Sequence, residues 1–484
     1  MNGNINVQQR IKIEYFLPLV FGFILLLVFL FFDQTGEYNY EFSEILTCTL
    51  LICSGVTGFF LYKNDLLNTK TLICLIAVCG FAFRLGYAIK IGYLQNQHDV
   101  ESLSSSGHLS YIYFIFKNLK LPDSNEWQFS HPPLHHILSA IVVWISSVLG
   151  FTIERSFENI ELLTVFYSSI SMLLGVKICT ELGIKGKALV LCSLILAFFP
   201  GMFVLAGSIN NDILMIMLTL AAMLYLVKWY KSPSVKFALF CGLFSGLAMM
   251  TKVSAALFAV AATLTVLIKF LTDKSLKFSK VLLHALVFVA LLLPLGLWHP
   301  IRNFVLFEQP LGYVAPIPLT NPLYNGDISL FERIVLPFST TVTGVYVDVW
   351  TEYNLWGYIL RNSLFGEYYF GVEGIAIFIV IANLVLILVS LISLIVLLCS
   401  KNSIKTILPI LPFYVVLLAF FVYFNIQYPF GCSMDFRYIV PLFFIGVVYI
   451  GLGLQKVGKC NKFLEYSACV STTVLCLTTV IIFI

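Results

Sequence analysis

Long apolar segments separated by short polar breaks follow one another along almost the entire chain. Each segment is close to the roughly 17 to 25 residues with which a helix crosses the hydrocarbon core of a membrane. We therefore expect an all-α polytopic membrane protein. The apolar windows lie at residues 14–32, 43–62, 71–90, 134–150, 160–180, 188–206, 212–229, 236–250, 253–271, 281–298, 373–399, 406–424, 437–454 and 466–484.

The composition agrees with this pattern and excludes several classes of protein. Of the 484 residues, 60% are hydrophobic and 11% are charged, which leaves too little polar surface to cover a water-soluble globule. The net charge of +4 is small and lies mainly on lysines of short loops, so we expect no nucleic-acid partner. The phosphate-binding motifs G-x-x-x-x-G-K-[ST] and G-x-G-x-x-G do not occur, which argues against direct use of a nucleotide.

The distribution of basic residues predicts the orientation of the helices, because positive charge in short loops marks the cytoplasmic side. The basic breaks contain Arg10 and Lys12, Lys63 to Lys70, Lys185 and Lys187, Lys228 to Lys236, Lys269 to Lys280, Lys401 and Lys405, and Lys456 to Lys462. The remaining breaks contain the candidate catalytic and binding residues, and we expect these breaks on the extracytoplasmic side. They are 33–42, 91–130, 207–212, 250–252, 299–371 and 428–435.

One stretch does not fit this alternation. Two apolar windows, 134–150 and 160–180, separate the outward break at 91–130 from the next basic break, where an odd number of crossings is needed. We expect one of the two not to cross fully, which gives about 13 transmembrane helices, an inside N-terminus and an outside C-terminus. The two long outer breaks should carry interfacial helices. In the first, LSYIYFIFKNLKL at 109–121 combines tyrosines and lysines with an apolar face.

Histidines and acids gather in the first long outer break. The segment FSHPPLHH at 129–136 holds three of the seven histidines, and Asp99 and Glu101 lie about thirty residues upstream. Three interpretations are open: a general-base site around Asp99, a metal site of histidine and aspartate, or a polar interface without chemistry. His131 and His135 are four residues apart and would share a helix face, so they are the candidate metal ligands. The sequence does not require a divalent metal.

Other charged residues lie at the same membrane boundary. Asp212 opens an apolar window after two asparagines, and we expect it to cap a helix whose dipole favours its charge. Lys252, Arg302 and Arg437 lie at the ends of other windows. Each has an ordinary explanation, such as a lysine that reaches the interface or an arginine neutralised by Asp435. As a set they are more informative, because isolated charges at this depth are costly and usually functional.

This set of residues predicts a transferase with a lipid phosphate as leaving group. Arginine and lysine suit the charge that grows on a departing phosphate, and a carboxylate can orient and activate an acceptor hydroxyl. A leaving group of this type is a weak base, so it needs no general acid. The helix bundle would admit the lipid tail from the side.

The order of these elements resembles that of the glycosyltransferase C superfamily. Within it, the chain is similar to the branch of protein O-mannosyltransferases and lipid A aminoarabinose transferases, which is glycosyltransferase family 39-like. The similarity covers roughly residues 71–305, and Val100 stands where some relatives carry an acid. It rests on QHDVES at 97–102, FSHPPL at 129–134, SINNDIL at 208–214, GLAMMTK at 246–252 and HPIRN at 299–303.

The resemblance implies roles for the candidate residues. Asp99 would be the catalytic carboxylate and Asp212 the second acid, and Glu101 is an alternative position for the acid missing at Val100. Lys252 and Arg302 would contact the lipid phosphate. His131 and, on a weaker match, Arg437 would take part in substrate binding.

The resemblance also implies a reaction and a domain organisation. The donor would be a hexose or pentose on polyprenyl phosphate, used with inversion outside the cell membrane, and the acceptor a glycan, lipid or protein. The implied divisions are 1–70 for additional transmembrane helices, 71–305 for the catalytic membrane core, 306–371 for an extracytoplasmic loop and 372–484 for C-terminal transmembrane helices.

Two other functions stay open. A transporter or flippase of lipid-linked or polar substrates also uses proline-interrupted helices and embedded charges. It predicts polar residues through the middle of the membrane, whereas 20–30 and 380–398 are apolar throughout or nearly so. A membrane-bound acyltransferase uses an intramembrane histidine, for which His284 is the candidate. Its position near the inward end of the window 281–298 favours a structural role.

Overall fold

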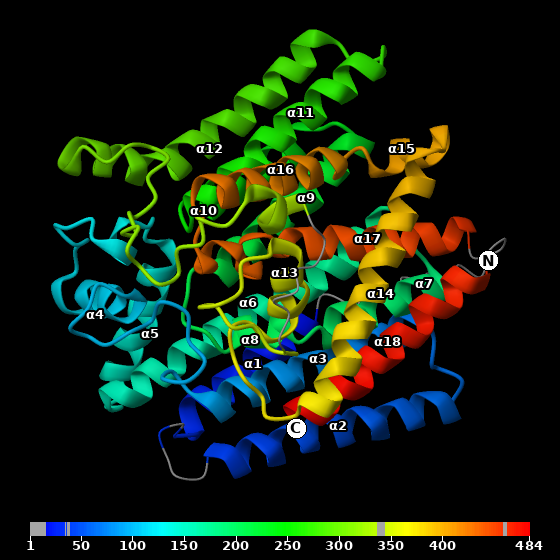
Figure 1. Cartoon of the computed structure of the whole chain (residues 1–484). Coiled ribbons are helices and arrows are strands. Elements are labelled where there is room, and N and C mark those ends of the chain that lie inside the picture. The colour runs from blue at the N-terminus through cyan, green and yellow to red at the C-terminus, as the bar shows by residue number, and fades with distance from the viewer. Residues whose placement is uncertain (1–15, 34, 36–38, 336–343, 458–461) are drawn as a thin grey trace, which may run out of the picture.

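The structure is a computed structural model that describes residues 16–33, 35, 39–335, 344–457 and 462–484. The basic N-terminal segment with Arg10 and Lys12 lies outside the described residues. In the described part, helices make up nearly all regular structure, and the only β-type pairing is an isolated bridge between Tyr324 and Phe430. The helices pack into a bundle (Figure 1), so the all-α prediction is confirmed.

Every predicted apolar window contains a helix. Apolar runs form helices in a membrane because only an internal hydrogen-bond ladder satisfies the backbone there. The helices are α1 (Leu17–Phe31), α2 (Asn39–Lys63), α3 (Thr69–Ile91), α5 (Leu134–Val148), α6 (Ile153–Glu181), α7 (Gly186–Phe198), α8 (Gly201–Ala206), α9 (Asp212–Lys231), α10 (Val235–Met249), α11 (Ala256–Thr272), α12 (Phe278–Phe307), α14 (Glu373–Leu398), α15 (Lys401–Ile407), α16 (Leu411–Gln427), α17 (Val440–Val457) and α18 (Lys462–Phe483).

Two windows that we expected to be continuous are broken. The window 188–206 divides at Pro200 into α7 and α8, and 406–424 divides around Pro409 into α15 and α16. Proline lacks the N–H that the helix ladder needs and clashes with the preceding turn. The axes of α15 and α16 meet at 67°. A proline does not always break a helix, since Pro294 and Pro300 lie inside the continuous helix α12.

The number of membrane crossings stays a prediction. Eight helices of the described residues are long and apolar enough to span a membrane, or nine if the bent pair α15 and α16 is one span. Shorter apolar helices add to these; they are α1, α5, α7, α10 and most of α17. These helices are compatible with about 13 crossings and do not fix the number.

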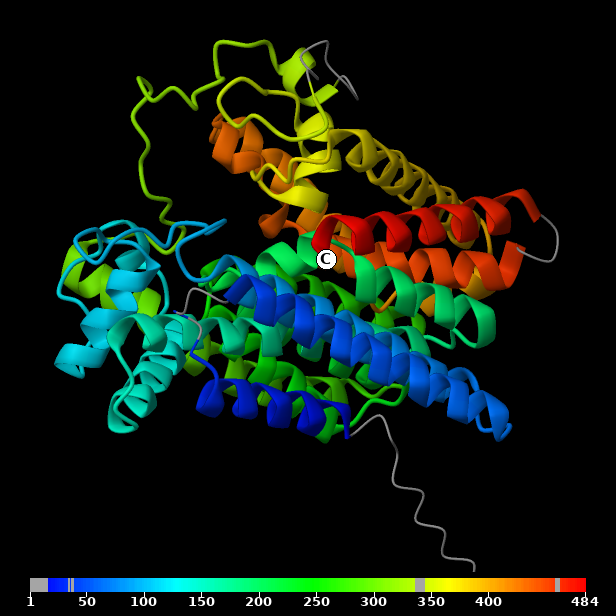
Figure 2. The ribbon, with the colours of Figure 1, turned by 90° about the horizontal axis from the view of Figure 1, so that it is seen from below.

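The first long outer break forms a small unit at one end of the bundle. It contains α4 (His108–Asn118), which matches the predicted interfacial helix, and a short 3-10 helix, η2 (Trp127–Ser130). The buried side chains of α4 pack with those of α5 and the first turns of α6 in a core of their own. Figure 2 shows α4 and α5 together, to one side of the long helices. With 15 residues α5 is about 22 Å long, which favours 134–150 as the incomplete crossing.

The second long outer break packs against the bundle. Its helix α13 (Leu355–Phe365) is mostly buried, and the Asn383 side chain of α14 donates a hydrogen bond to the Leu360 carbonyl oxygen at 2.9 Å. This helix therefore packs into the core, and its expected position at the membrane interface stays a prediction. The loop also contains the π-helical turn η4 (Phe331–Val335). Two 3-10 turns, η5 (Gly431–Met434) and η6 (Phe436–Tyr438), connect α16 to α17 nearby.

Candidate active site

Five charged side chains from distant parts of the chain meet at one end of the bundle. We call Asp99, Asp212, Lys252, Asp435 and Arg437 the charged cluster. Arg437 Nη1 donates a hydrogen bond to Asp99 Oδ2 at 2.7 Å and lies 3.9 Å from Asp212 Oδ2. Arg437 Nε lies 3.2 Å from Asp435 Oδ2, and Lys252 Nζ donates to Asp212 Oδ1 at 2.5 Å. Two cations thus connect three carboxylates from three segments.

Asp99 is held by the backbone between α3 and α4. Its φ is +57°, in the left-handed region that aspartate tolerates better than most residues. Its carbonyl oxygen accepts a hydrogen bond from His108 N at 2.9 Å, at the start of α4. At Gly107, the N-cap of α4, a Cβ would lie 2.5 Å from the Val100 carbonyl oxygen. The close approach of α4 therefore fixes the backbone that carries the carboxylate.

The neighbouring Gln97 ties this loop to the turn before α9. Its side-chain amide donates to the Gly207 carbonyl oxygen at 2.7 Å and to Glu161 Oε1 at 2.9 Å. Its Oε1 accepts a hydrogen bond from Ile209 N at 2.8 Å. The turn that Gln97 holds leads directly into Asp212, so one side chain sets the positions of both the Asp99 loop and the start of α9.

Asp212 is the first residue of α9 and not its cap, so the predicted capping role is wrong. The N-cap is Asn211, and the Asp212 N–H donates to Asn210 Oδ1 at 3.0 Å. The carboxylate still lies in the first helical turn, where the helix dipole favours negative charge. Asn211 Nδ2 donates to the Thr251 carbonyl oxygen at 3.1 Å, which brings the adjacent Lys252 to Asp212.

Arg437 enters the cluster from the turn between α16 and α17. Asp435, between η5 and η6, accepts a hydrogen bond from Arg437 N through Oδ1 at 2.9 Å. The next residue, Phe436, donates its N–H to Asn362 Oδ1 of α13 at 2.6 Å. The second long outer break thereby positions the arginine. The expectation that Asp435 neutralises Arg437 describes only part of this arrangement, because Asp99 shares the same guanidinium.

The surroundings set the charge of Asp99 and Arg437. Burial raises the pKa of Asp99, but the Arg437 guanidinium outweighs it and the pKa lies below its usual value. Burial lowers the pKa of Arg437, but Asp99 and the other acids outweigh it and the pKa lies well above its usual value. The Tyr438 ring centroid lies 5.0 Å from Lys252 Nζ and 5.3 Å from the Arg437 guanidinium carbon, a distance at which the ring stabilises cations.

Asp99 is the most accessible carboxylate of the cluster. Its side chain is 29% exposed, compared with 1% for Asp212 and 4% for Asp435. Asp99 is therefore the carboxylate of the cluster that a solute can reach most easily, whereas the buried Asp212 holds Lys252.

Two residues that the sequence indicated lie outside the charged cluster. Glu101 is exposed, two residues beyond Asp99, and also has a positive φ of 48°. Arg302, near the end of α12, donates to the Pro122 carbonyl oxygen at 2.8 Å and to Asn303 Oδ1 at 3.0 Å. None of the ion pairs found among the described residues joins Glu101 or Arg302 to the cluster.

The histidines around FSHPPLHH form a group of packed rings. His108 Nδ1 and His136 Nε2 lie 2.9 Å apart, and the ring of His136 stacks on that of Tyr111 at 4.0 Å. Burial, followed by the charge of the nearby lysine, lowers the pKa of His131 to about 4, so His131 is neutral at pH 7. Both ring nitrogens of His135 are buried and have no hydrogen-bond partner in the described part of the chain.

The predicted metal pair does not coincide with the arrangement best suited to a metal. Among the described residues, the one set of three or more histidine, cysteine and acidic side chains with ligand-like spacing is His98, Glu367 and Asp435. It includes neither His131 nor His135. Sequence reasoning did not single out Glu367, because it lies in a long loop without a periodic pattern. Its only signal is that it is an acid in an outward break.

Comparison with known proteins matches the central part of the chain to a family. Residues 130–298 match the family model described as dolichyl-phosphate-mannose-protein mannosyltransferase. The chain is similar to membrane glycosyltransferases. The match confirms the resemblance inferred from the motifs and includes Asp212 and Lys252, whereas Asp99 and Arg437 lie outside the matched range. No curated protein matches the chain.

The geometry also bears on the acyltransferase alternative. His284 in α12 is buried, and its Nδ1 accepts a hydrogen bond from Trp229 Nε1 at 3.1 Å. It borders a mostly apolar cavity of about 140 Å³ between α9, α10, α11 and α12. Arg302 lies 18 residues farther along the same helix, or about 27 Å. His284 therefore has a structural hydrogen bond and lies far from the end of the bundle that carries the charges.

Proposed function

We propose that this chain is an inverting glycosyltransferase that moves a sugar from polyprenyl phosphate to an acceptor hydroxyl on the extracytoplasmic face of the cell membrane. The observation that carries the proposal is the ion pair of the accessible Asp99 with Arg437, beside Lys252 and Asp212. It puts one base next to two cations. The mannosyltransferase match over 130–298 supports the same reaction class.

The cations would bind the donor phosphate. Lys252 and Arg437 suit this task because hydrogen bonds from cations to phosphate oxygens are strong and strengthen as the leaving phosphate gains charge. Both cations are engaged by carboxylates in the structure, so a bound phosphate would compete for them and loosen the hold of Arg437 on Asp99. We propose that Arg302 and the neutral His131 contact the donor at the edge of this site.

Asp99 would then act as the general base. The acceptor oxygen gives its proton to the Asp99 carboxylate and forms a bond to the anomeric carbon, on the side opposite the phosphate. The bond between that carbon and the phosphate oxygen breaks, and the electron pair leaves with polyprenyl phosphate. This displacement inverts the anomeric centre. Asp212 would hold Lys252 in place, and Glu101, an exposed acid two residues beyond Asp99, would assist the base.

A donor panel tests this proposal. Purified full-length protein in lipid nanodiscs would be given radiolabelled sugars on polyprenyl phosphate or as sugar nucleotides. The acceptors would be a serine- and threonine-containing peptide, a methyl glycoside and a membrane lipid extract. We expect transfer only from a polyprenyl-phosphate sugar, with inversion seen by NMR of the product. Transfer from a sugar nucleotide without lipid carrier, or retention of configuration, would overturn the proposal.

A further inference from the structure

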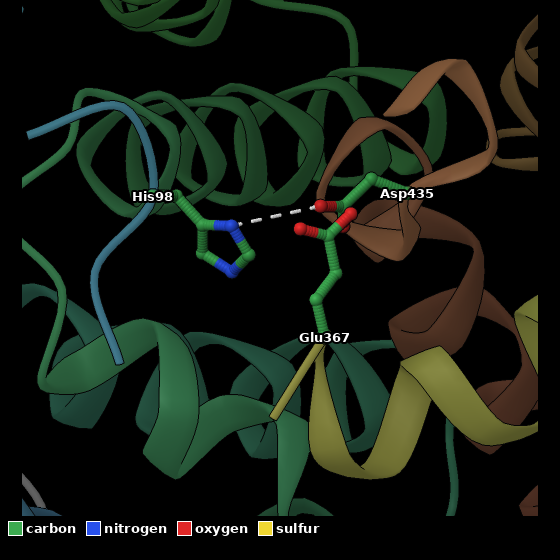
Figure 3. A group of neighbouring side chains, drawn as sticks. All are labelled: His98, Glu367 and Asp435. Carbon is green, nitrogen blue, oxygen red and sulfur yellow. Dashed lines mark ion pairs between the residues drawn. The ribbon is translucent and has the colours of Figure 1, made fainter. Parts of the chain in front are cut away.

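Three side chains of the kinds that bind metals converge beside the charged cluster (Figure 3). His98 lies in the loop after α3, Glu367 between α13 and α14, and Asp435 between η5 and η6. One ligand atom of each lies within 4.8 Å of those of the other two, and His98 Nδ1 is 3.8 Å from Asp435 Oδ2. Three segments far apart in the sequence thus direct ligand atoms toward one point.

Asp435 supplies an independent observation that suits a metal ligand, because one of its buried oxygens accepts no hydrogen bond from the described residues. Its exposed fraction is 3%, and its Oδ2 atom has no hydrogen-bond donor in the described part of the chain, although Arg437 Nε lies 3.2 Å away. A buried carboxylate oxygen is costly unless its charge is paired and it accepts hydrogen bonds, and the contact with Arg437 supplies the charge but no aligned hydrogen bond. An ion between Asp435 and its two neighbours would satisfy this oxygen.

Outer contacts hold the three side chains in place, as is usual around metal ligands. The Tyr358 hydroxyl donates to Glu367 Oε1 at 2.9 Å. The ring of His98, which is 5% exposed, lies 5.2 Å from that of Tyr368. The other oxygen of Asp435 accepts the hydrogen bond from Arg437 N. Each side chain therefore has a contact that orients it toward the shared point.

We propose that His98, Glu367 and Asp435 bind one divalent transition-metal ion. One imidazole and two carboxylates suit zinc or manganese better than magnesium, which favours oxygen ligands and water. Ligand atoms around a tetrahedral ion at about 2.1 Å are about 3.4 Å apart. The ligand atoms lie within 4.8 Å of one another, so any two of them would have to approach each other by at most about 1.4 Å.

The ion would position the proposed catalytic groups without touching the sugar. His98 directly precedes Asp99, and Asp435 lies two residues before Arg437, so one ion would join the two loops that supply this pair. It would also engage Asp435, one of the carboxylates that compete for the Arg437 guanidinium. The arginine would then be freer to bind an anionic ligand. Metal binding itself does not depend on the proposed sugar transfer.

Metal binding by the full-length protein tests this inference. Protein purified in detergent and stripped with a chelator would be titrated with zinc chloride, manganese chloride or magnesium chloride, and bound metal counted by mass spectrometry. We expect about one zinc or manganese ion per chain and little magnesium. Glu367→Gln keeps the size of the side chain and removes its charge, so zinc affinity should fall at least about 100-fold. Loss of a residue that only contacts a metal ligand typically lowers metal affinity by about 10- to 100-fold.

The matched control is His135→Gln, which removes a buried histidine of the neighbouring ring group and should leave zinc affinity unchanged. Asp435→Asn provides a second ligand variant, and thermal unfolding of each stripped variant shows whether it is folded. Zinc should raise the melting temperature of the wild type and of His135→Gln but not of Glu367→Gln. Failure of the wild type to bind one equivalent would overturn the inference. So would wild-type zinc affinity in folded Glu367→Gln, or loss of binding in His135→Gln alone.

Discussion

At the scale of residues, the balance of charge in the cluster is the main feature. Three carboxylates share two cations. Lys252 pairs with Asp212, the most buried of the three acids. Asp99 was predictable from the histidines and acids that gather in the first long outer break. The sequence allowed us to predict Asp212, Lys252 and Arg437, because a charged residue at the end of an apolar window stands out. Arg302 stands out in the same way but forms its hydrogen bonds to Pro122 and Asn303 instead. The position of a residue at the end of an apolar window predicts its depth in the membrane, but it does not predict the direction in which the side chain points.

Lys252→Ala should weaken use of the donor more than it slows the chemical step. A charge-assisted hydrogen bond to phosphate contributes about 1.5 to 3 kcal/mol, which corresponds to a rise in donor KM of roughly 10- to 100-fold. Steady-state kinetics with varied donor at saturating acceptor measures this change.

The matched control is Lys120→Ala, since Lys120 is an exposed lysine of the first outer loop whose ion pair is with Asp123, three residues away. It should leave donor KM unchanged. Arg302→Ala should raise donor KM less than Lys252→Ala does, because Arg302 lies outside the charged cluster. An unchanged donor KM in Lys252→Ala, with an altered response to acceptor, would refute the phosphate role.

At the scale of elements, helix positions were predictable and the joints between them were not. Hydrophobic length identifies each helix, because lipid leaves the backbone no other partner. The break at Pro200 and the continuous helix through Pro294 show that the presence of a proline does not by itself predict where a helix breaks. Tertiary packing also hides polar groups from a hydropathy pattern. Arg84 is fully buried in α3 and donates to Ser168 Oγ and to the Gly80, Ala197 and Leu196 carbonyl oxygens.

These contacts bear on the transporter alternative. A transport pathway needs polar groups that a moving substrate can reach. Arg84 instead joins α3 to α6 and to the end of α7 through hydrogen bonds that use each of its guanidinium nitrogens. A polar residue in the middle of the bundle is therefore explained by packing of helices.

Gly107→Ala should displace the loop that carries Asp99. The added Cβ would lie 2.5 Å from the Val100 carbonyl oxygen, and overpacking of this kind costs about 1 to 3 kcal/mol. We expect a lower melting temperature. We also expect the transfer rate per folded molecule to fall, because the added methyl group moves Asp99. Gly312→Ala is the control, since no atom of the described residues lies within 4 Å of its Cβ position. Equal transfer rates in the two variants would show that α4 does not position Asp99.

At the scale of the whole molecule, a few contacts show which breaks lie at the same end of the bundle. Lys231 Nζ donates to the Glu181 carbonyl oxygen at 2.8 Å and Gln455 Nε2 to the Gly183 carbonyl oxygen at 3.3 Å, so basic breaks lie together at one end. At the opposite end Lys90 Nζ donates to the Ile484 carbonyl oxygen at 3.1 Å. Lys90 is on the last turn of α3, just before the Asp99 loop.

The last residue and the charged cluster should therefore lie on the same side of the membrane, which we predict to be the extracytoplasmic one. An epitope tag after Ile484 should bind antibody in intact, wall-free cells. A tag in the basic loop at Lys274 should bind only after the membrane is permeabilised. Labelling of the Lys274 tag in intact cells, with none at the C-terminus, would put the proposed active site in the cytoplasm.

The central claim is that Asp99 takes the acceptor's proton in a site whose cations hold the donor. The most direct measurement gives wild type and Asp99→Asn the same radiolabelled polyprenyl-phosphate sugar, and records donor bound to the protein and label on the acceptor separately. Asn cannot accept the proton but keeps the size of the side chain. We predict that Asp99→Asn binds the donor at least as well as the wild type and transfers it at less than about one hundredth of the rate, within the 10²–10⁴-fold range of a lost general base. Transfer by Asp99→Asn at the wild-type rate would contradict the account.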